Sequence, residues 1–360
     1  MSLHLPSVST GFVQMSSEWP FRLHMYTEQQ IVRYIQYCTR TKYSLVHIDA
    51  TGGVLRKLAD QNQSYMYAVV FKDGNDTNDT MPLAHGLLTE HTTISIVTFL
   101  GSIAQSIIKV KGKLLNPTFF ITDFSPAIMN ATLLAFNAQI MQAHFHHCLN
   151  VIGKKYSAIQ LRSSSFIHLC CCHVMHAIAK NLTDAAVEKE TRESVLYVFA
   201  LILCETELRK MYDLLGSLVN IFGDPHNRNA SNELELLFAE ELLVDEESHF
   251  ALTNTEKIFF EAKKMDEELS LVDEYFRSNA AIIHESPFNK EAIRLYPAIE
   301  QLLDAKAHLY KVTNPLFSRK LIRLIYRWWA YLPLWTGLLI DFKTRYASDG
   351  ECDSISAHSP

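Results

Sequence analysis

Several features that would place this sequence in a class at once are missing from it. It has no Walker-type phosphate loop and no Gly-x-Gly-x-x-Gly fingerprint, so the commonest nucleotide-binding sites are not predicted. Its seven cysteines are odd in number and three are adjacent, at residues 170–172. Such spacing does not make a disulfide framework and predicts reduced thiols in an intracellular protein. The first residues lack a basic segment followed by an apolar run, so no signal peptide is predicted.

The sequence also lacks a strong charge of either sign. Its net charge is −6, with 48 % hydrophobic and 20 % charged residues, which is typical of a globular protein with a sizeable core. Any polyanionic partner would therefore have to meet a local basic face. The apolar run 321–340 has the length of a membrane span, but Arg323, Arg327 and Pro333 lie inside it. Charges at that depth are costly in lipid, so a buried or amphipathic helix is predicted, and no membrane contact.

Hydrophobic periodicity predicts an α/β protein. Apolar residues at helical spacing predict helices at 27–40 and 92–110, with Thr caps, and a third helix opens at Ser125-Pro126. Strands are predicted at 43–49, 65–71, 83–89, 118–123 and 166–170, and from about 174 to 345 the pattern is helical. The first three strands should form an antiparallel meander, and the later strands should be parallel crossovers. The result is a mixed five-stranded sheet with flanking helices on both faces and a large all-helical insertion.

Two of these predicted strands end on an aspartate. Asp49 follows "YSLVHI" and Asp123 follows "TFFIT". Functional groups collect at the carboxyl ends of strands in α/β sheets, so the two carboxylates should converge if the strands are neighbours. Paired carboxylates repel each other unless a cation lies between them, and Mg²⁺ or Mn²⁺ suits oxygen ligands. Two such ions would clamp the attacking and leaving oxygens of a phosphoryl transfer. The alternative for a single strand-ending Asp is a turn former or helix cap.

Four stretches resemble the catalytic core of Mutator-like (MULE-type) DDE transposases. They are "HIDATGGV", "MPLAHGLLTEHTTISIVTFL", "ITDFSPAIMNATLLAF" and "LCCCHVMHAIAK", which follow one another within roughly residues 20–180. The later "YLPLWTGLL" and "RYASDG" look like the end of that family's helical insertion.

The resemblance implies a ribonuclease H-like fold and a catalytic acidic triad that binds two divalent metal ions and drives DNA strand cleavage and transfer at transposon ends. It places the first two acids at Asp49 and Asp123, and the family's Cys-x2-His signature at Cys170 and His173. It divides the chain into an N-terminal lead-in with one helix (1–42), the DDE core (43–180), the helical insertion (181–345) and a loop-like tail (346–360). DNA as partner and the nucleus as location follow from it.

The third acid departs from the family pattern. The family's Glu lies on a helix after the insertion, whereas this chain reaches "RYASDGECDSISAHSP" there. The third acid is therefore predicted to be missing, by truncation or gene decay. Glu351 in the tail is the weak candidate, and Glu233, Glu235 and Glu240 in the acidic stretch are others. An incomplete and inactive core is expected, and a non-catalytic scaffold that binds nucleic acid or protein is the alternative.

Two Cys/His clusters could hold zinc. The first comprises Cys170, Cys172, His173 and His176, which is half of a structural zinc site without a second pair, so a buried strand-to-helix junction is favoured. The second comprises His144, His146, His147 and Cys148. On a helix His144 shares a face with Cys148 and with His147, but no third firm ligand can be assigned. Zinc is therefore not expected at either cluster.

A basic segment follows the acidic one. Residues 306–345 hold eight basic residues and one acid, together with Trp328, Trp329 and Trp335. These residues could lie along DNA, with the basic side chains on phosphates and the aromatic rings stacked on bases. Equally, the arginines could pair with residues 232–274, which hold 14 acids and three bases.

Overall fold

The computed structural model describes most of the chain between residues 11 and 340. The described ranges are 11–41, 43–58, 60–72, 80–157, 160–161, 163–184, 189–242, 276, 279–304, 306–307 and 311–340. The chain divides into two compact units, neither of which is one continuous segment. The first unit comprises Met1–His144 with Tyr156–Cys170, and the second comprises Phe145–Lys155 with Cys171–Pro360.

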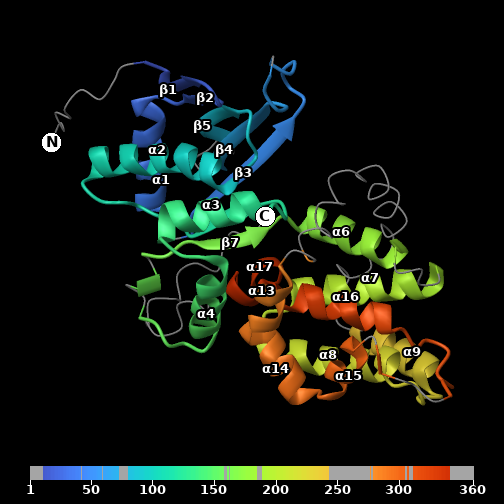
Figure 1. Cartoon of the computed structure of the whole chain (residues 1–360). Helices are drawn as coiled ribbons and strands as arrows, with labels where there is room; N and C mark the ends of the chain where they lie inside the picture. Colours follow the sequence, from blue (N-terminus) through green and yellow to red (C-terminus); the bar gives the residue numbers. More distant parts are fainter. Residues whose placement is uncertain are drawn as a thin grey trace. The chain divides into compact units, whose positions relative to one another are not determined.

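The first unit is built on a mixed sheet of seven strands (Figure 1). The strands lie in the order β1-β2-β5-β4-β3-β6-β7. Strands β3, β4 and β5 form the expected antiparallel meander, and β6 and β7 continue the sheet parallel to β3. The strand bounds are β1 Val13–Glu18, β2 Phe21–Met25, β3 Leu45–Gly52, β4 Tyr65–Lys72, β5 Thr80–Leu88, β6 Phe119–Thr122 and β7 Phe166–Leu169.

The expectation of five strands was wrong, because the lead-in before residue 43 contributes two more. β1 and β2 form a hairpin across Trp19–Pro20, and β2 pairs antiparallel with β5. β1 has little period-2 pattern, since it ends in three polar residues, and β2 alternates apolar with polar residues but is only five residues long, so neither gives a strong strand signal. The lead-in therefore extends the sheet as well as supplying a helix.

Three helices pack against one face of this sheet (Figure 1): α1 Glu28–Arg40, α2 Thr93–Lys111 and α3 Pro126–Asn137. Thr27 caps α1 through a reciprocal capping box with Gln30, and Thr92 caps α2 by accepting from the Ser95 N–H. Their apolar faces form one core with the alternate residues of the strands, including Val46, Ile48, Tyr67, Val69, Phe71 and Phe120.

The opposite face of the sheet is covered unevenly. Phe119 and Phe166 are register partners on this face, and both are buried. The ring of His144, from α4 (Met141–Ile152), lies 5.9 Å from that of Phe166. On β3, by contrast, His47 and Asp49 are exposed. The end of β3 that carries Asp49 is therefore open to solvent on this face.

The described part of the second unit from residue 171 onward contains helices and no strand. Helix α6 packs on α7, α8 on α9, and α16 on α8 and α15. The bounds are α6 Cys171–Asp184, α7 Lys189–Cys204, α8 Leu208–Gly223, α9 Ala230–Leu242, α13 Ala280–Glu285, α14 Pro287–Leu295, α15 Ala298–Leu303, α16 Arg319–Trp329, α17 Leu332–Trp335 and the 3₁₀ turn η1 Gly337–Leu339. The second unit begins its main part at residue 171 and includes part of α4 as well.

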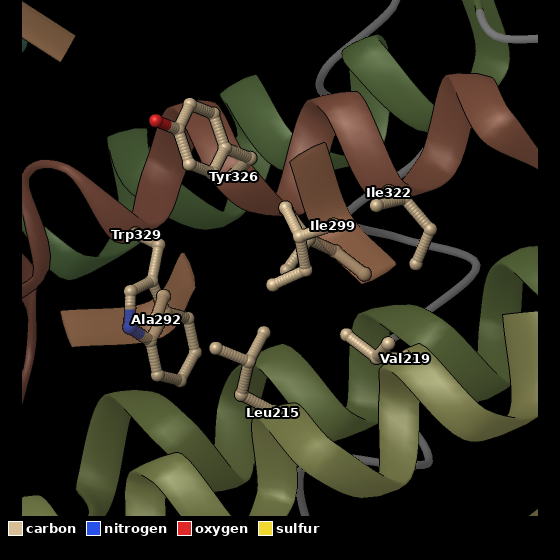
Figure 2. Close-up of a pocket in the computed structure, with 8 residues that line it drawn as sticks. Leu215, Val219, Ala292, Ile299, Ile322, Tyr326 and Trp329 are labelled. Atoms are coloured by element: carbon tan, nitrogen blue, oxygen red, sulfur yellow. The ribbon is translucent and has the colours of Figure 1, made fainter. Parts of the chain in front are cut away.

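A small cavity lies between α8, α14, α15 and α16 (Figure 2). Its volume is about 10 Å³, which is room for about one water molecule. The residues that line it include Leu215, Val219, Ala292, Ile299, Ile322, Tyr326 and Trp329, and the surface that they present to it is apolar. A water molecule there would find few polar partners, so the cavity is a packing gap and not a ligand site.

The apolar run 321–340 is not one helix. It is divided among α16, α17 and η1, with Pro333 in the first turn of α17. Among the described helices, α2 has the length and apolar composition that could cross a membrane. Its residues Ile96, Phe99, Leu100 and Ile103 are fully buried in the core of the first unit. This burial accounts for its hydrophobicity.

Candidate metal centre

The parallel strands align the two predicted acids in one row. The last register pair between β3 and β6 is Ile48 with Thr122, and the last pair between β6 and β7 is Thr122 with Leu169. The residues that follow these pairs are Asp49 after Ile48, Asp123 after Thr122 and Cys170 after Leu169. Neighbouring strands lie about 4.8 Å apart, and residues of one row project to the same face. The backbone therefore brings Asp49 and Asp123 together, as the strand pattern predicts.

Asp49 is exposed, and its Oδ1 accepts a hydrogen bond from the Ala50 N–H at 2.7 Å. The prediction that its strand ends at this residue was wrong. β3 stops pairing with β6 at Ile48, but its pairing with β4 continues to Gly52. Asp49 is thus held in extended backbone by β4 while its β6 side is open, which fixes the position of its carboxylate.

Asp123 is half-buried and lies between the end of β6 and the start of α3. Its backbone carbonyl accepts from the Ser125 N–H at 2.7 Å, which turns the chain sharply after the strand. Because Ser125 and Pro126 open the helix directly behind this turn, the carboxylate stays at the end of a central strand.

Cys170 and His173 lie where β7 passes into α6. A carboxylate oxygen of Asp123, the Cys170 sulfur and a ring nitrogen of His173 lie within 4.8 Å of one another. Asp49 is not a member of this group of potential metal ligands, which is the group of three found in the described chain. A carboxylate, a thiolate and an imidazole suit a borderline ion such as Zn²⁺, whereas Mg²⁺ prefers oxygen ligands alone. The expectation that zinc is not bound here stays a prediction.

The sequence could not reveal this neighbourhood. Cys170 and His173 show only half of a zinc site, and the third potential ligand is 47 positions earlier in the chain. The signal is the register between two parallel strands, which becomes visible only once the strand order is known.

No third acid joins Asp49 and Asp123 among the residues that the structure describes. Glu351 lies outside the described residues, as does the side chain of Glu240. Glu233 on α9 accepts hydrogen bonds of 2.8 Å from the side-chain amides of Asn220 and Asn227, so it serves the packing of the second unit. Glu235 lies on the same helix.

The second Cys/His cluster lies on α4. His144 and Cys148 are buried, while His146 is exposed. None of its members belongs to a group of three potential ligands in the described chain.

The tryptophans of the basic segment do not offer rings to nucleic acid. Trp328, Trp329 and Trp335 are fully buried, and the indole N–H of Trp328 donates to Asn181. Arg319 and Arg323 donate to backbone carbonyls at the end of α15, among them those of Asp304 and Leu303. The DNA-stacking interpretation is therefore wrong for these rings, and these two arginines serve as helix C-caps.

A second group of polar side chains at the carboxyl end of β6 was not foreseen. Tyr67 on β4, His91 before α2 and Ser125 before α3 are joined by hydrogen bonds. They come from three separate segments, so no local motif signals them.

Compared with known proteins, the sequence matches no protein-family model and no curated protein sequence.

Proposed function

We propose that the chain is a transposase-derived core of the ribonuclease H-like type, similar to Mutator-like DDE transposases, whose acidic centre is incomplete. One observation carries the proposal: Asp49 and Asp123 follow the last register pair of β3 and β6, two adjacent parallel strands in the interior of the sheet. The strand order supports it, because a meander followed by two parallel strands on its first strand is the arrangement that the resemblance implies. The proposal names DNA as the partner and the nucleus as the location.

A divalent metal ion fits the two carboxylates. Asp49 is exposed and Asp123 is half-buried, so an ion held by them would keep several of its waters, as Mg²⁺ prefers. Cys170, in the next position of the row, offers a sulfur atom and not a third carboxylate. When bound, the ion would stabilise charge on phosphate oxygens during strand cleavage. With two acids and no third in the described chain, weak binding and no strand transfer are expected.

A non-catalytic scaffold is the second candidate. The observation that favours it is the group Asp123, Cys170 and His173, since a thiol and an imidazole beside the second acid do not suit a two-magnesium centre.

Manganese titration of the whole chain tests the proposal. Mn²⁺ binding, followed by electron paramagnetic resonance, should weaken by about tenfold or more in Asp49→Asn and in Asp123→Asn. The matched control is Asp60→Asn, an acid of the same unit outside the row. Equal Mn²⁺ binding by all four proteins would overturn the metal centre and favour the scaffold.

Cleavage of labelled duplex DNA in Mn²⁺ tests completeness. The absence of a third acid should cost about three decades or more of rate, so no cutting is expected. Robust cutting that disappears in Asp123→Ala would show that a further acid completes the centre.

A further inference from the structure

Ser125, His91 and Tyr67 form a hydrogen-bonded chain within the first unit. The hydroxyl oxygen of Ser125 lies 3.1 Å from Nε2 of His91, and Nδ1 of the same ring lies 2.6 Å from the hydroxyl oxygen of Tyr67. Both distances are within hydrogen-bond range, and the two bonds use the two nitrogens of one imidazole. Nucleophile, base and orienting group are arranged in this order in nucleophilic enzymes on unrelated folds.

The hydroxyl of Ser125 does not form the helix-capping hydrogen bond that its position favours. Ser125 occupies the N-cap of α3, where a serine ordinarily accepts from a backbone N–H of the first turn. It makes no such bond, whereas Thr27 and Thr92 do so at α1 and α2. Its described side-chain partner is His91. The strand-to-helix turn thus presents a half-buried hydroxyl to an imidazole.

The surroundings of His91 keep its ring available as a proton acceptor. The ring lies against two aromatic rings, with centroids 5.0 Å from Tyr65 and 6.0 Å from Tyr67. Burial lowers the pKa of His91, so the imidazole is neutral at neutral pH. Tyr67 is fully buried, and burial raises the pKa of its phenol, which therefore stays protonated and uncharged.

We propose that Ser125 is a nucleophile for acyl transfer from carboxylic esters, with His91 as its general base and Tyr67 as a positioning residue. In the tautomer with the proton on Nδ1, that nitrogen donates to Tyr67 and Nε2 accepts the hydroxyl proton of Ser125. As Oγ bonds to the carbonyl carbon, the proton moves to Nε2. When the bond to the leaving alcohol breaks, this proton passes to the alcohol oxygen. Water then releases the acyl group by the same transfers, which restores the serine hydroxyl.

The first turn of α3 supplies the remaining element. Pro126 has no N–H, but the amides of Ala127 and Ile128 lie in the first turn, where an α-helix has no internal acceptors. Such donors stabilise the oxyanion that develops during acyl transfer. The acyl transfer needs no metal ion, so an experiment can disprove it without bearing on the proposed DNA function, and the reverse also holds.

A fluorophosphonate probe, applied to the whole chain, tests this assignment. The serine oxygen displaces fluoride from phosphorus, and the hydroxyl proton leaves through His91. We expect one adduct by intact mass, mapped to Ser125, which is lost in Ser125→Ala and unchanged by EDTA. The rate constant of labelling should fall about 100-fold in His91→Gln, the loss of a general base. In Tyr67→Phe the labelling rate constant should fall while the half-saturating probe concentration stays the same.

Ser102 provides the matched control. Its hydroxyl also lies near an imidazole, 3.2 Å from His24 Nδ1, but it donates to the Phe99 carbonyl and His24 is fully buried. Ser102→Ala should label normally. A second measurement does not depend on the probe's fit: in Ser125→Cys, alkylation by iodoacetamide should slow when His91→Gln is added. Labelling away from Ser125, no labelling, or rates independent of His91 would each overturn the proposal.

Discussion

His24, on β2, is a fully buried imidazole whose charged form is disfavoured. Burial, and then the nearby charge of Arg22, lower the pKa of His24 from 6.5 to about 4. Its Nδ1 lies 3.2 Å from the hydroxyl of Ser102, so this nitrogen of the neutral ring has a hydrogen-bond partner. In the unfolded chain the ring takes up a proton near pH 6.5.

A pH-dependent loss of stability follows from this difference. Below pH 6.5 the unfolded state binds a proton that the folded state does not bind, so the free energy of unfolding falls as the pH falls. The contribution of His24 to stability is fully present above pH 6.5. Between pH 7.5 and 5 the loss should be about 2 kcal/mol at most. Urea unfolding at the two pH values measures it. His24→Asn, which can keep the bond to Ser102, should show a smaller difference, and an unchanged difference would contradict this assignment.

Cys170 offers a test of the row geometry. Cys170→Asp places a third carboxylate beside Asp123, so Mn²⁺ affinity should rise about tenfold or more if the row is correct. Cys171→Asp, at an exposed position one residue later, is the matched control and should leave the affinity unchanged. A titration that gives equal affinities for both variants would show that the residue-170 side chain does not reach the carboxylates.

Single residues were predictable where backbone direction decides their position. Asp49 and Asp123 could be placed from two apolar runs and a turn. The rings of Trp328 and Trp335 could not, because a helix that is buried all round and a basic amphipathic helix share arginines and aromatics in sequence. Whether Arg319 meets a phosphate or a helix end depends on α15, which the sequence does not place beside it.

At the scale of elements, α8 approaches Tyr296 at a glycine. A Cβ added at Gly216 would lie 2.7 Å from Cζ of Tyr296, whose hydroxyl donates to the Tyr212 carbonyl at 2.8 Å. Alanine would gain about 1 kcal/mol in helix propensity, but the overlap with ring atoms costs more. Gly216→Ala should therefore lower the free energy of unfolding by about 1–2 kcal/mol.

Gly101 on α2 is the matched position, since a Cβ there meets nothing within 4 Å. Gly101→Ala should raise the free energy of unfolding by about 0.5–1 kcal/mol, which is the propensity gain alone. Thermal or urea unfolding of both variants measures the pair. Stabilisation by both substitutions would mean that Tyr296 yields to the added methyl group.

Elements with strong local signals were predictable, and those defined by pairing were not. The Thr caps predicted the starts of α1 and α2 to the residue. β1 and β2 have no such signal, because β2 is placed by pairing with β5, more than 60 residues later, and β1 is placed by pairing with β2. The same applies to the end of β3, which is set by β4 and not by its own apolar run.

At the scale of the molecule, the first unit is completed only by a late segment. The segment 156–170, which contains β7, returns to a unit whose main part ends at His144. Asn137 and Ser165 exchange two hydrogen bonds, of 2.7 and 3.1 Å, and Phe166 packs beside Phe119. Without this segment β6 would keep its pairing with β3 but would become the edge strand of the sheet.

Fragments test this dependence. Residues 1–170 should unfold cooperatively in urea, whereas residues 1–144 should not, because the latter lose β7 and expose the parallel edge of β6. Circular dichroism against urea concentration measures both. A cooperative transition of residues 1–144 equal to that of 1–170 would show that β7 is dispensable.

The overall architecture was predictable in part. A mixed α/β sheet with a meander and parallel additions follows from the order of strands and helices along the chain. The two additional strands, β1 and β2, and a unit boundary that takes part of α4 away from its neighbours in sequence, depend on contacts between distant segments. Patterns within a window of residues carry no information on such contacts.

The irregular first strand has a consequence for how the protein behaves in concentrated solution. Among the described residues β1 is an edge strand, and its first residue Val13 and the preceding Phe12 are about half exposed, which invites a second chain to add its own strand. The register shift between Val13 and Met15 leaves Gln14 as an extra residue, and its side-chain amide donates to the carbonyls of Gly11 and Tyr26. A bulge of this kind twists the edge and spoils it as a template. Deleting Gln14 should therefore turn a protein that stays dispersed into one that scatters light as its concentration rises.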